Sequence, residues 1–261
     1  MKIIVCAKQV PDTNDVKIDH KKGTLIREGV PSILNPDDAN ALEAALQIKD
    51  ANPGTTVTVV TMGPNQAAYM IRECLAMGAD EGYIFSSRAF AGADTCATSK
   101  TLAAGIQWLG GADLVFCGRQ AIDGDTAQVG PQLGQRLGVP VVTYVQAIKT
   151  EGDKLVVERQ LEDGYQIVEV QTPCLLTAVK ELNTPRYMTV KGIVEAYEKE
   201  VHIVNEKDLN LDPSECGLAA SPTQVIKSFT PPPKGKGQML KGTIPEMASA
   251  LVDKLSAGHL I

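Results

Sequence analysis

The residues best suited to chemistry lie in one glycine-rich segment, Cys117 to Gly138, which reads CGRQAIDGDTAQVGPQLGQRLG. Gly118 and Gly124 allow a ligand to approach the backbone closely. Thr126 and Gln128 can donate hydrogen bonds to phosphate oxygens, and the free amides of a helix that begins at Thr126 would attract an anion. This pattern predicts a phosphate-binding turn. An ordinary capped helix after a glycine loop fits the composition about equally well.

Two aspartates in this segment need a different role, because carboxylates that face a pyrophosphate would repel it. Asp123 or Asp125 can accept hydrogen bonds from ribose hydroxyls, and one of them can cap the following helix. We therefore expect phosphate oxygens to meet backbone amides, with the carboxylates to the side.

The elements that must position this segment follow from the apolar pattern of the chain. Short, nearly continuous apolar runs alternate with longer stretches in which Ala and Leu recur at helical spacing. Strands are predicted over residues 3–7, 56–62, 82–86, 113–117, 141–145 and 175–179, and helices over residues 38–49, 67–77, 95–109 and 126–137. This β-α-β-α order predicts an α/β fold with a doubly wound, mostly parallel sheet.

Ligands of such sheets bind beyond the carboxyl ends of the strands, and three further turns should reach that edge. Two of these turns follow the predicted strands at Cys6 and Met62. The third is the helix start Asn35-Pro36-Asp37-Asp38, in which Asn35 is the expected capping residue. Together they outline a pocket for adenine and ribose. Cys6 and Met62 suit an adenine face, although either can equally be a core residue.

The remaining segments lie outside the alternating pattern. Residues 16–27 and 154–170 predict hairpins at the margin of the sheet. Residues from about 181 to 245 are rich in turn signals and proline, and are predicted to be irregular. We expect residues 1–190 to form the α/β domain and residues 191–261 an extended arm that ends in a helix over 245–257. Such an arm suits contact with another subunit, and a disordered tail is the alternative.

Composition excludes several classes of function. The 261 residues carry a formal net charge of -6, which removes the basic surface expected of a nucleic-acid partner. No uncharged apolar run approaches the ~20 residues of a membrane-spanning helix, and the amino terminus does not resemble a signal peptide. We therefore expect a soluble, cytoplasmic protein with no membrane or nucleic-acid partner.

Standard catalytic motifs are absent from the chain. The common dinucleotide, phosphate-loop and hydrolase patterns do not occur. The three histidines are scattered and the six cysteines form no C-x-x-C pair, so a metal site or a histidine-dependent reaction is not expected. Any nucleotide must therefore be bound by a different structural motif.

Two further stretches carry a family resemblance. The segment VERQLEDGYQIVEVQTPCLLT contains Val157, Arg159, Glu162-Asp163-Gly164, Gln166, Val168, Pro173 and Leu175-Leu176-Thr177 at characteristic spacing, and KELNTPRY follows at residues 180–187. With the glycine-rich loop, these residues resemble the beta subunit of an electron-transferring flavoprotein over essentially the whole chain. The resemblance implies an adenine-nucleotide-binding type of doubly wound domain.

The resemblance also implies cofactors and partners. The chain would pair with an alpha subunit that carries its own FAD. Ordinary beta subunits hold AMP as a structural ligand, whereas electron-bifurcating ones hold a second FAD. The loop GRQAIDGDTAQVGP resembles the bifurcating form of anaerobic bacteria, so we expect FAD, with AMP as the alternative. NADH would then deliver hydride to this flavin, and electrons would pass to the alpha-subunit FAD and to ferredoxin or flavodoxin. No catalytic side chain is required, because the flavin supplies the chemistry.

Site residues follow from the same resemblance. The cofactor-binding residues implied are Cys6, Asn35, Pro36, Asp37, Asp38, Met62, Gly118, Arg119, Gln120, Ala121, Ile122, Asp123, Gly124, Asp125, Thr126, Ala127, Gln128 and Val129. Residues 180–187 would dock an FAD-dependent dehydrogenase of the acyl-CoA or 2-hydroxy acid type. The residues implied in docking are Leu182, Asn183, Pro185 and Arg186, with Leu182 as an exposed anchor. The alternative is a simple connection between strand and arm.

Overall fold

A nine-stranded sheet forms the centre of the molecule, with the order β11-β10-β9-β12-β8-β1-β6-β7-β13. In this computed structural model the described residues are all except 13–17, 20–23, 26–30, 153, 228 and 230–234. The strands of the sheet are β1 (Lys2–Cys6), β6 (Thr56–Met62), β7 (Glu81–Phe85), β8 (Leu114–Gly118), β9 (Val141–Glu151), β10 (Lys154–Leu161), β11 (Gly164–Gln171), β12 (Cys174–Ala178) and β13 (Val201–Val204). All neighbouring pairs are parallel except β9-β10 and β10-β11, which are antiparallel.

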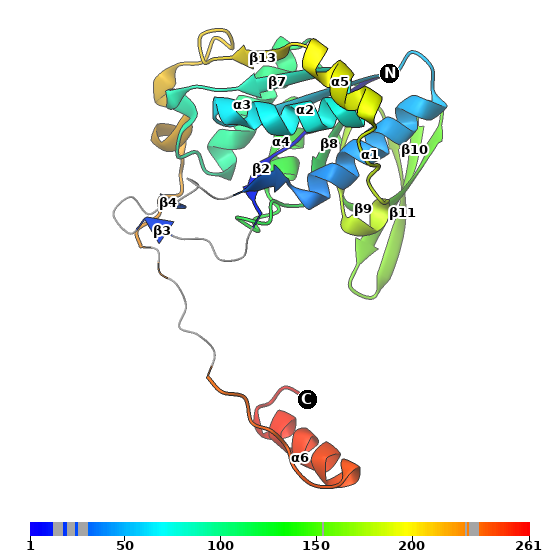
Figure 1. Cartoon of the computed structure of the whole chain (residues 1–261), viewed down its shortest axis with the longest axis vertical. Coiled ribbons are helices and arrows are strands. Elements are labelled where there is room, and N and C mark those ends of the chain that lie inside the picture. Colours follow the sequence, from blue (N-terminus) through cyan, green and yellow to red (C-terminus); the bar gives the residue numbers. More distant parts are fainter. Residues whose placement is uncertain (13–17, 20–23, 26–30, 153, 228, 230–234) are drawn as a thin grey trace.

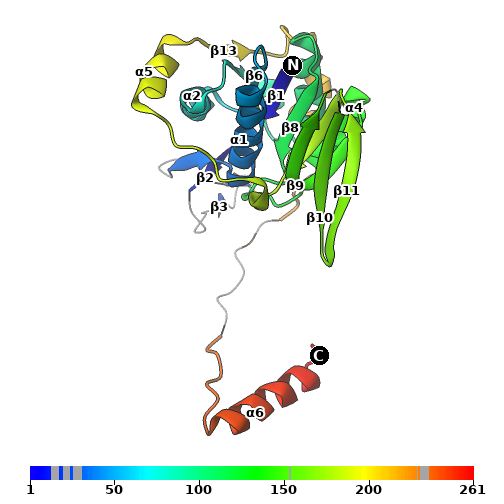
Figure 2. The ribbon, with the colours of Figure 1, turned by 90° about the vertical axis from the view of Figure 1, so that its right-hand side faces the viewer.

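Helices cover both faces of the sheet. The helices are α1 (Pro36–Ala51), α2 (Ala68–Met77), α3 (Thr95–Trp108), α4 (Val129–Leu137), α5 (Val190–Glu198) and α6 (Ile244–Ala257). Buried residues of α1 and α2 join one apolar cluster, and those of α3 and α4 join a second, so the two pairs lie on opposite faces. In Figure 2, α1, α2 and α5 lie on one side of the strands, with α5 outside α2.

The central strands form because they are apolar on both faces. Every residue of β8 and β12 is buried, and Ile3, Ile4 and Val5 of β1 are fully covered. Burying continuous apolar runs against helices on each side is the stable arrangement for parallel strands. The predicted doubly wound sheet is therefore confirmed, and so is the hairpin of β10 and β11.

Other predicted elements shift at their ends. The strand expected over 141–145 continues to Glu151 and joins the hairpin. The helix expected from Thr126 begins only at Val129. Of the hairpin expected over 16–27, β3 (Ile18–Asp19) and β4 (Thr24–Leu25) are antiparallel neighbours, and the turn between them lies outside the described residues. A further antiparallel pair joins β2 (Gln9–Pro11) to β5 (Ser32–Leu34).

The prediction of an irregular segment from residue 181 to 245 is wrong between 190 and 204. Helix α5 packs on α2, and β13 adds a ninth strand parallel to β7. Gly192 permits this packing, because a Cβ there would lie 2.3 Å from the carbonyl oxygen of Ala76. Both elements are too short for hydrophobic periodicity to reveal them.

The terminal helix is close to its predicted position. Helix α6 begins one residue earlier than expected, after a capping box of Thr243 and Glu246. None of its residues is buried, and it lies apart from the sheet in both views (Figures 1 and 2).

Close packing of α3 on the sheet gives a stability prediction. A Cβ at Gly105 would lie 2.1 Å from the ring of fully buried Phe85, so we expect Gly105→Ala to lower the free energy of unfolding by about 1–3 kcal/mol, despite the better helix propensity of alanine. Urea unfolding measures the change. Gly63→Ala is the control, because its nearest neighbour would lie 3.9 Å away. Equal stability of Gly105→Ala and the wild type would contradict the packing argument.

Candidate functional site

The candidate site lies where the sheet changes winding direction. From β1 the chain passes through α1 to β6 on one side, and it later returns through α3 to β8 on the other side of β1. The carboxyl ends of β1 and β8, where the helices lie on opposite faces, are the usual ligand position in such sheets. Cys6 ends β1 and Gly118 ends β8, in line with the prediction of this edge.

A buried carboxylate joins the two strand ends. Asp38 accepts the backbone N–H of Gly118 at 2.9 Å through one oxygen and that of Lys8 at 2.8 Å through the other. Burial raises the pKa of Asp38 to about 7, against the lowering effect of the two backbone hydrogen bonds. Gly118 has no room for a side chain, because a Cβ would lie 2.3 Å from the Asp38 carboxylate. The start of the glycine-rich loop is thus fixed on α1.

Asn35 holds the next part of the loop. Its side-chain amide donates to the carbonyl of Gln120 at 2.9 Å, and its side-chain oxygen accepts the N–H of Ile122 at 3.1 Å. Asn35 does stand at the N-cap position of α1, followed by the exposed Pro36, but its side chain makes no capping hydrogen bond. The expected capping role is therefore wrong, because the completely buried amide bonds the loop instead.

Two ion pairs complete the attachment of the loop. Lys8 Nζ lies 2.6 Å from Asp123 Oδ1, and Arg119 Nε lies 3.3 Å from Asp37 Oδ2. The second pair lacks hydrogen-bond geometry, so both of its buried atoms keep unused hydrogen-bonding capacity. Burial raises the pKa of Asp37, and the nearby Arg119 opposes the rise. The basic side chains at this edge are therefore already paired with carboxylates.

The aspartates of the loop have defined partners. The side chain of Asp123 is almost covered and bonds Lys8, whereas the exposed Asp125 accepts a 2.9 Å hydrogen bond from Gln120. Neither caps α4, because Gln128 stands at the N-cap position. Of the two roles predicted for these carboxylates, the capping role is wrong.

The tip of the loop presents backbone donors. Asp125 and Ala127 have positive φ angles of 48° and 52°, which stops a helix from starting at Thr126. Within the part of the chain that the structure describes, the N–H groups of residues 126 to 130 have no hydrogen-bond partner. Five successive free donors just before and at the start of α4 are typical of backbone segments that bind anions. The exposed Thr126 side chain lies beside them.

The strand ends next to the loop carry apolar residues. Cys6, Cys117 and the half-buried Met62 belong to the cluster between the sheet and α3 and α4. Contact with the thiol of Cys6, together with burial, raises the pKa of Cys117, so its thiol stays neutral. Neutral sulfur groups suit contact with a planar base. Of the remaining predicted residues, Ala121 is half-buried and Ile122 is exposed.

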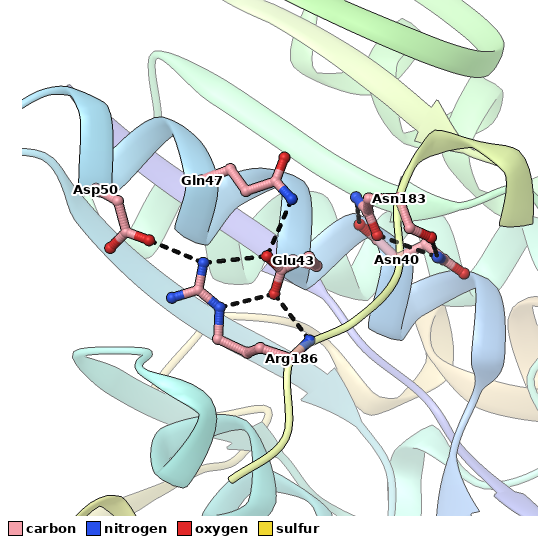
Figure 3. Close-up of polar contacts among 6 residues, drawn as sticks. All are labelled: Asn40, Glu43, Gln47, Asp50, Asn183 and Arg186. Atoms are coloured by element: carbon pink, nitrogen blue, oxygen red, sulfur yellow. Dashed lines mark hydrogen bonds and ion pairs between the residues drawn. The ribbon is translucent and has the colours of Figure 1, made fainter. Parts of the chain in front are cut away.

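The predicted docking residues lie on another part of α1. Asn183 and Arg186 bond side chains in the middle of that helix (Figure 3), and Pro185 is half-buried. Leu182 is half-buried and packs against the main apolar cluster. The expectation of a freely exposed Leu182 is therefore wrong, because the short helix Lys180–Leu182 turns this side chain toward the core.

Sequence reasoning missed two residues that shape these sites, Asn40 and Glu43, and it gave no role to Lys8 in the predicted turn after the first strand. All three are polar residues within or next to apolar stretches, and such polar interruptions were the available signal. Among the described residues, no group of three or more His, Cys, Asp or Glu side chains could hold a metal ion. None of the described helices combines the length and apolarity needed to cross a membrane.

Comparison with known proteins shows the family to which the chain belongs. Residues 22–209 match the family model described as electron transfer flavoprotein domain. The chain is 67% identical to the caffeyl-CoA reductase-Etf complex subunit CarD of Acetobacterium woodii, with all of both chains covered. It is 57% identical to the electron transfer flavoprotein subunit beta of Thermoanaerobacterium thermosaccharolyticum and 50% identical to the acryloyl-CoA reductase electron transfer subunit gamma of Anaerotignum propionicum, again over the full lengths.

The family match covers more than half of the chain, and the relatives match along its whole length. The chain therefore belongs to the electron transfer flavoprotein family, in which it is a beta subunit.

Proposed function

We propose that this chain binds FAD at the edge formed by Cys6, Gly118 and the loop up to Val129, and that it works as an electron-bifurcating beta subunit. The observation that carries the proposal is the run of free backbone N–H groups at residues 126–130. They are suited to the oxygens of a diphosphate, since backbone donors at a helix start attract anions.

The surrounding residues fit an adenine dinucleotide. Asn35 and Asp38 hold the first part of the loop, from Gly118 to Ile122, in a defined position. Cys6, Cys117 and Met62 offer an apolar surface for adenine. Asp125 is an exposed acceptor for ribose hydroxyls. These residues bind and orient, and none is assigned a proton transfer.

The bound flavin would accept hydride from NADH and pass single electrons to the alpha-subunit FAD and to ferredoxin or flavodoxin. The protein's contribution is to bind and orient the nucleotide end of the cofactor. This role agrees with the small number of histidines in the chain.

The proposed partners are an alpha subunit and an FAD-dependent dehydrogenase. The relatives named for caffeyl-CoA and acryloyl-CoA reductases favour an acyl-CoA reductase type over a 2-hydroxy acid dehydrogenase. We propose that residues 180–187 dock this dehydrogenase, with Leu182, Asn183, Pro185 and Arg186 in the contact region. The segment from residue 222 to 261, whose described residues are almost all exposed, would pack on the alpha subunit.

The ligand is tested by nucleotide analysis of the purified heterodimer. We expect two FAD molecules per alpha-beta pair, because the second dinucleotide occupies the beta subunit. Acid release followed by chromatography counts FAD and AMP directly. One FAD and one AMP per pair would overturn bifurcation and leave a structural nucleotide, whereas a beta subunit without any nucleotide would overturn the site itself.

The role of Asn35 gives a second prediction. Asn35→Ala leaves the carbonyl of Gln120 and the N–H of Ile122 without their buried partner, so the loop loses its fixed position. We expect nucleotide affinity at the beta site to fall roughly tenfold, the effect of about 1.4 kcal/mol. Equilibrium dialysis measures the loss, with the alpha-subunit FAD as an internal reference. Asn65→Ala, at an exposed position, is the control. An unchanged affinity in Asn35→Ala would remove this residue from the site.

A further inference from the structure

The segment proposed to dock the dehydrogenase is held on helix α1 by buried polar contacts. Figure 3 shows Arg186 and Asn183 reaching side chains that project from one face of that helix. The segment is otherwise attached by little backbone bonding: the N–H of Leu182 donates to the carbonyl of Val179, and among the described residues it joins no strand. Leu182 is held by packing against the apolar cluster, and the position of residues 183–186 depends on the side chains of α1.

Glu43 is the first of these anchors. One of its oxygens accepts the backbone N–H of Arg186 at 3.1 Å and the Nε of the same residue at 2.8 Å, and its other oxygen accepts the terminal guanidinium nitrogen at 3.1 Å. Gln47 donates a further hydrogen bond at 3.0 Å. The carboxylate is buried, and its bonds to Arg186 and Gln47 lower its pKa against the effect of burial, so it stays ionised. Glu43 thus fixes both the backbone and the side chain of Arg186.

Asn40 is the second anchor, one helical turn earlier. Its side-chain amide donates to the backbone carbonyl of Asn183 at 2.7 Å, and the amide of Asn183 donates to the backbone carbonyl of Asn40 at 2.9 Å. This reciprocal pair is buried on the helix side. Asn40 and Glu43 therefore clamp the chain at two points, with only Thr184 and Pro185 between them.

The clamp determines where the ends of the docking segment lie. Leu182 directly precedes the first point, and Tyr187 directly follows the second and is 96% exposed. A backbone that is fixed at both points loses less conformational freedom on binding, and such preorganisation strengthens association. Asp50 also bonds Arg186 at 2.8 Å, but its carboxylate is mostly exposed and a contact of that kind contributes little.

We infer that Asn40 and Glu43 are positioning residues for partner binding, which hold residues 183–186 so that the dehydrogenase meets a preformed surface. The inference rests on the proposed docking function of residues 180–187. The same helix carries Asn35 and Asp38 in its first turn, so the nucleotide loop and the docking segment share one rigid support.

The test uses the complete heterodimer and the purified acyl-CoA reductase-type dehydrogenase of its complex. We expect Glu43→Gln to raise the KM for the heterodimer roughly tenfold while kcat at saturation and nucleotide content stay within about twofold, because a buried charge-assisted contact is lost away from the cofactor. Arg186→Lys, which keeps the charge but loses the forked geometry, should raise KM by a smaller factor. General damage to the fold would instead lower kcat and nucleotide content.

Comparison of four variants separates the possible outcomes. Asp50→Asn, at the exposed carboxylate of the same guanidinium, should change KM by less than about twofold. The positioning role is overturned if Asp50→Asn raises KM as much as Glu43→Gln does. It is also overturned if Glu43→Gln and Arg186→Lys leave KM unchanged while Leu182→Ala raises it. If Leu182→Ala itself leaves KM unchanged, the proposed docking function of the segment fails instead. Should Glu43→Gln not fold, Arg186→Lys and Asn183→Ala test the same contacts from the segment side.

Discussion

The structure of the site depends on the buried carboxylate of Asp38. The N–H groups of Lys8, after β1, and of Gly118, at the end of β8, lie close together. The side chain of Asp38 accepts both hydrogen bonds. Without an acceptor, two buried donors would each lose the free energy of a hydrogen bond. The bond to Gly118 also requires a glycine, since any side chain would collide with the carboxylate. One interaction thus sets the origin of the loop that follows β8.

Helix α1 carries further buried polar residues that fix other segments on one face of the protein. Asn35, Asp37, Asp38, Asn40 and Glu43 are all buried, which is unusual for one helix. They are tolerated because each bonds or pairs with a group in another segment: the loop after β8 at one end, and residues 183–186 in the middle. The helix therefore contributes specific polar contacts with irregular segments in addition to the apolar residues that it buries against the sheet. Loops that would otherwise sample many conformations acquire defined positions.

The sequence predicts the elements whose signal is local and misses those that depend on partners. Continuous apolar runs identify the parallel strands, and glycines with hydroxyl and amide groups identify the loop after β8. The start of α4 is misjudged because Asp125 and Ala127 adopt positive φ angles that composition does not demand. Asn35 is misassigned as a cap because its spacing before Pro36 fits capping, whereas its partners lie 85 and 87 residues away. The half-buried state of Leu182 likewise depends on a distant packing partner.

At this edge of the sheet, the attraction for an anion depends mainly on the positions of backbone N–H groups. Lys8 and Arg119 are paired with Asp123 and Asp37, so their positive charges are largely compensated within the protein. An anionic ligand at this edge would be held mainly by backbone N–H dipoles, whose attraction depends on their convergence. A small displacement of the loop turns several donors away together, whereas a lost basic side chain removes only one contact. In the proposed site, the residues that position the loop, above all Asn35 and Asp38, would therefore affect nucleotide affinity together with the donors themselves.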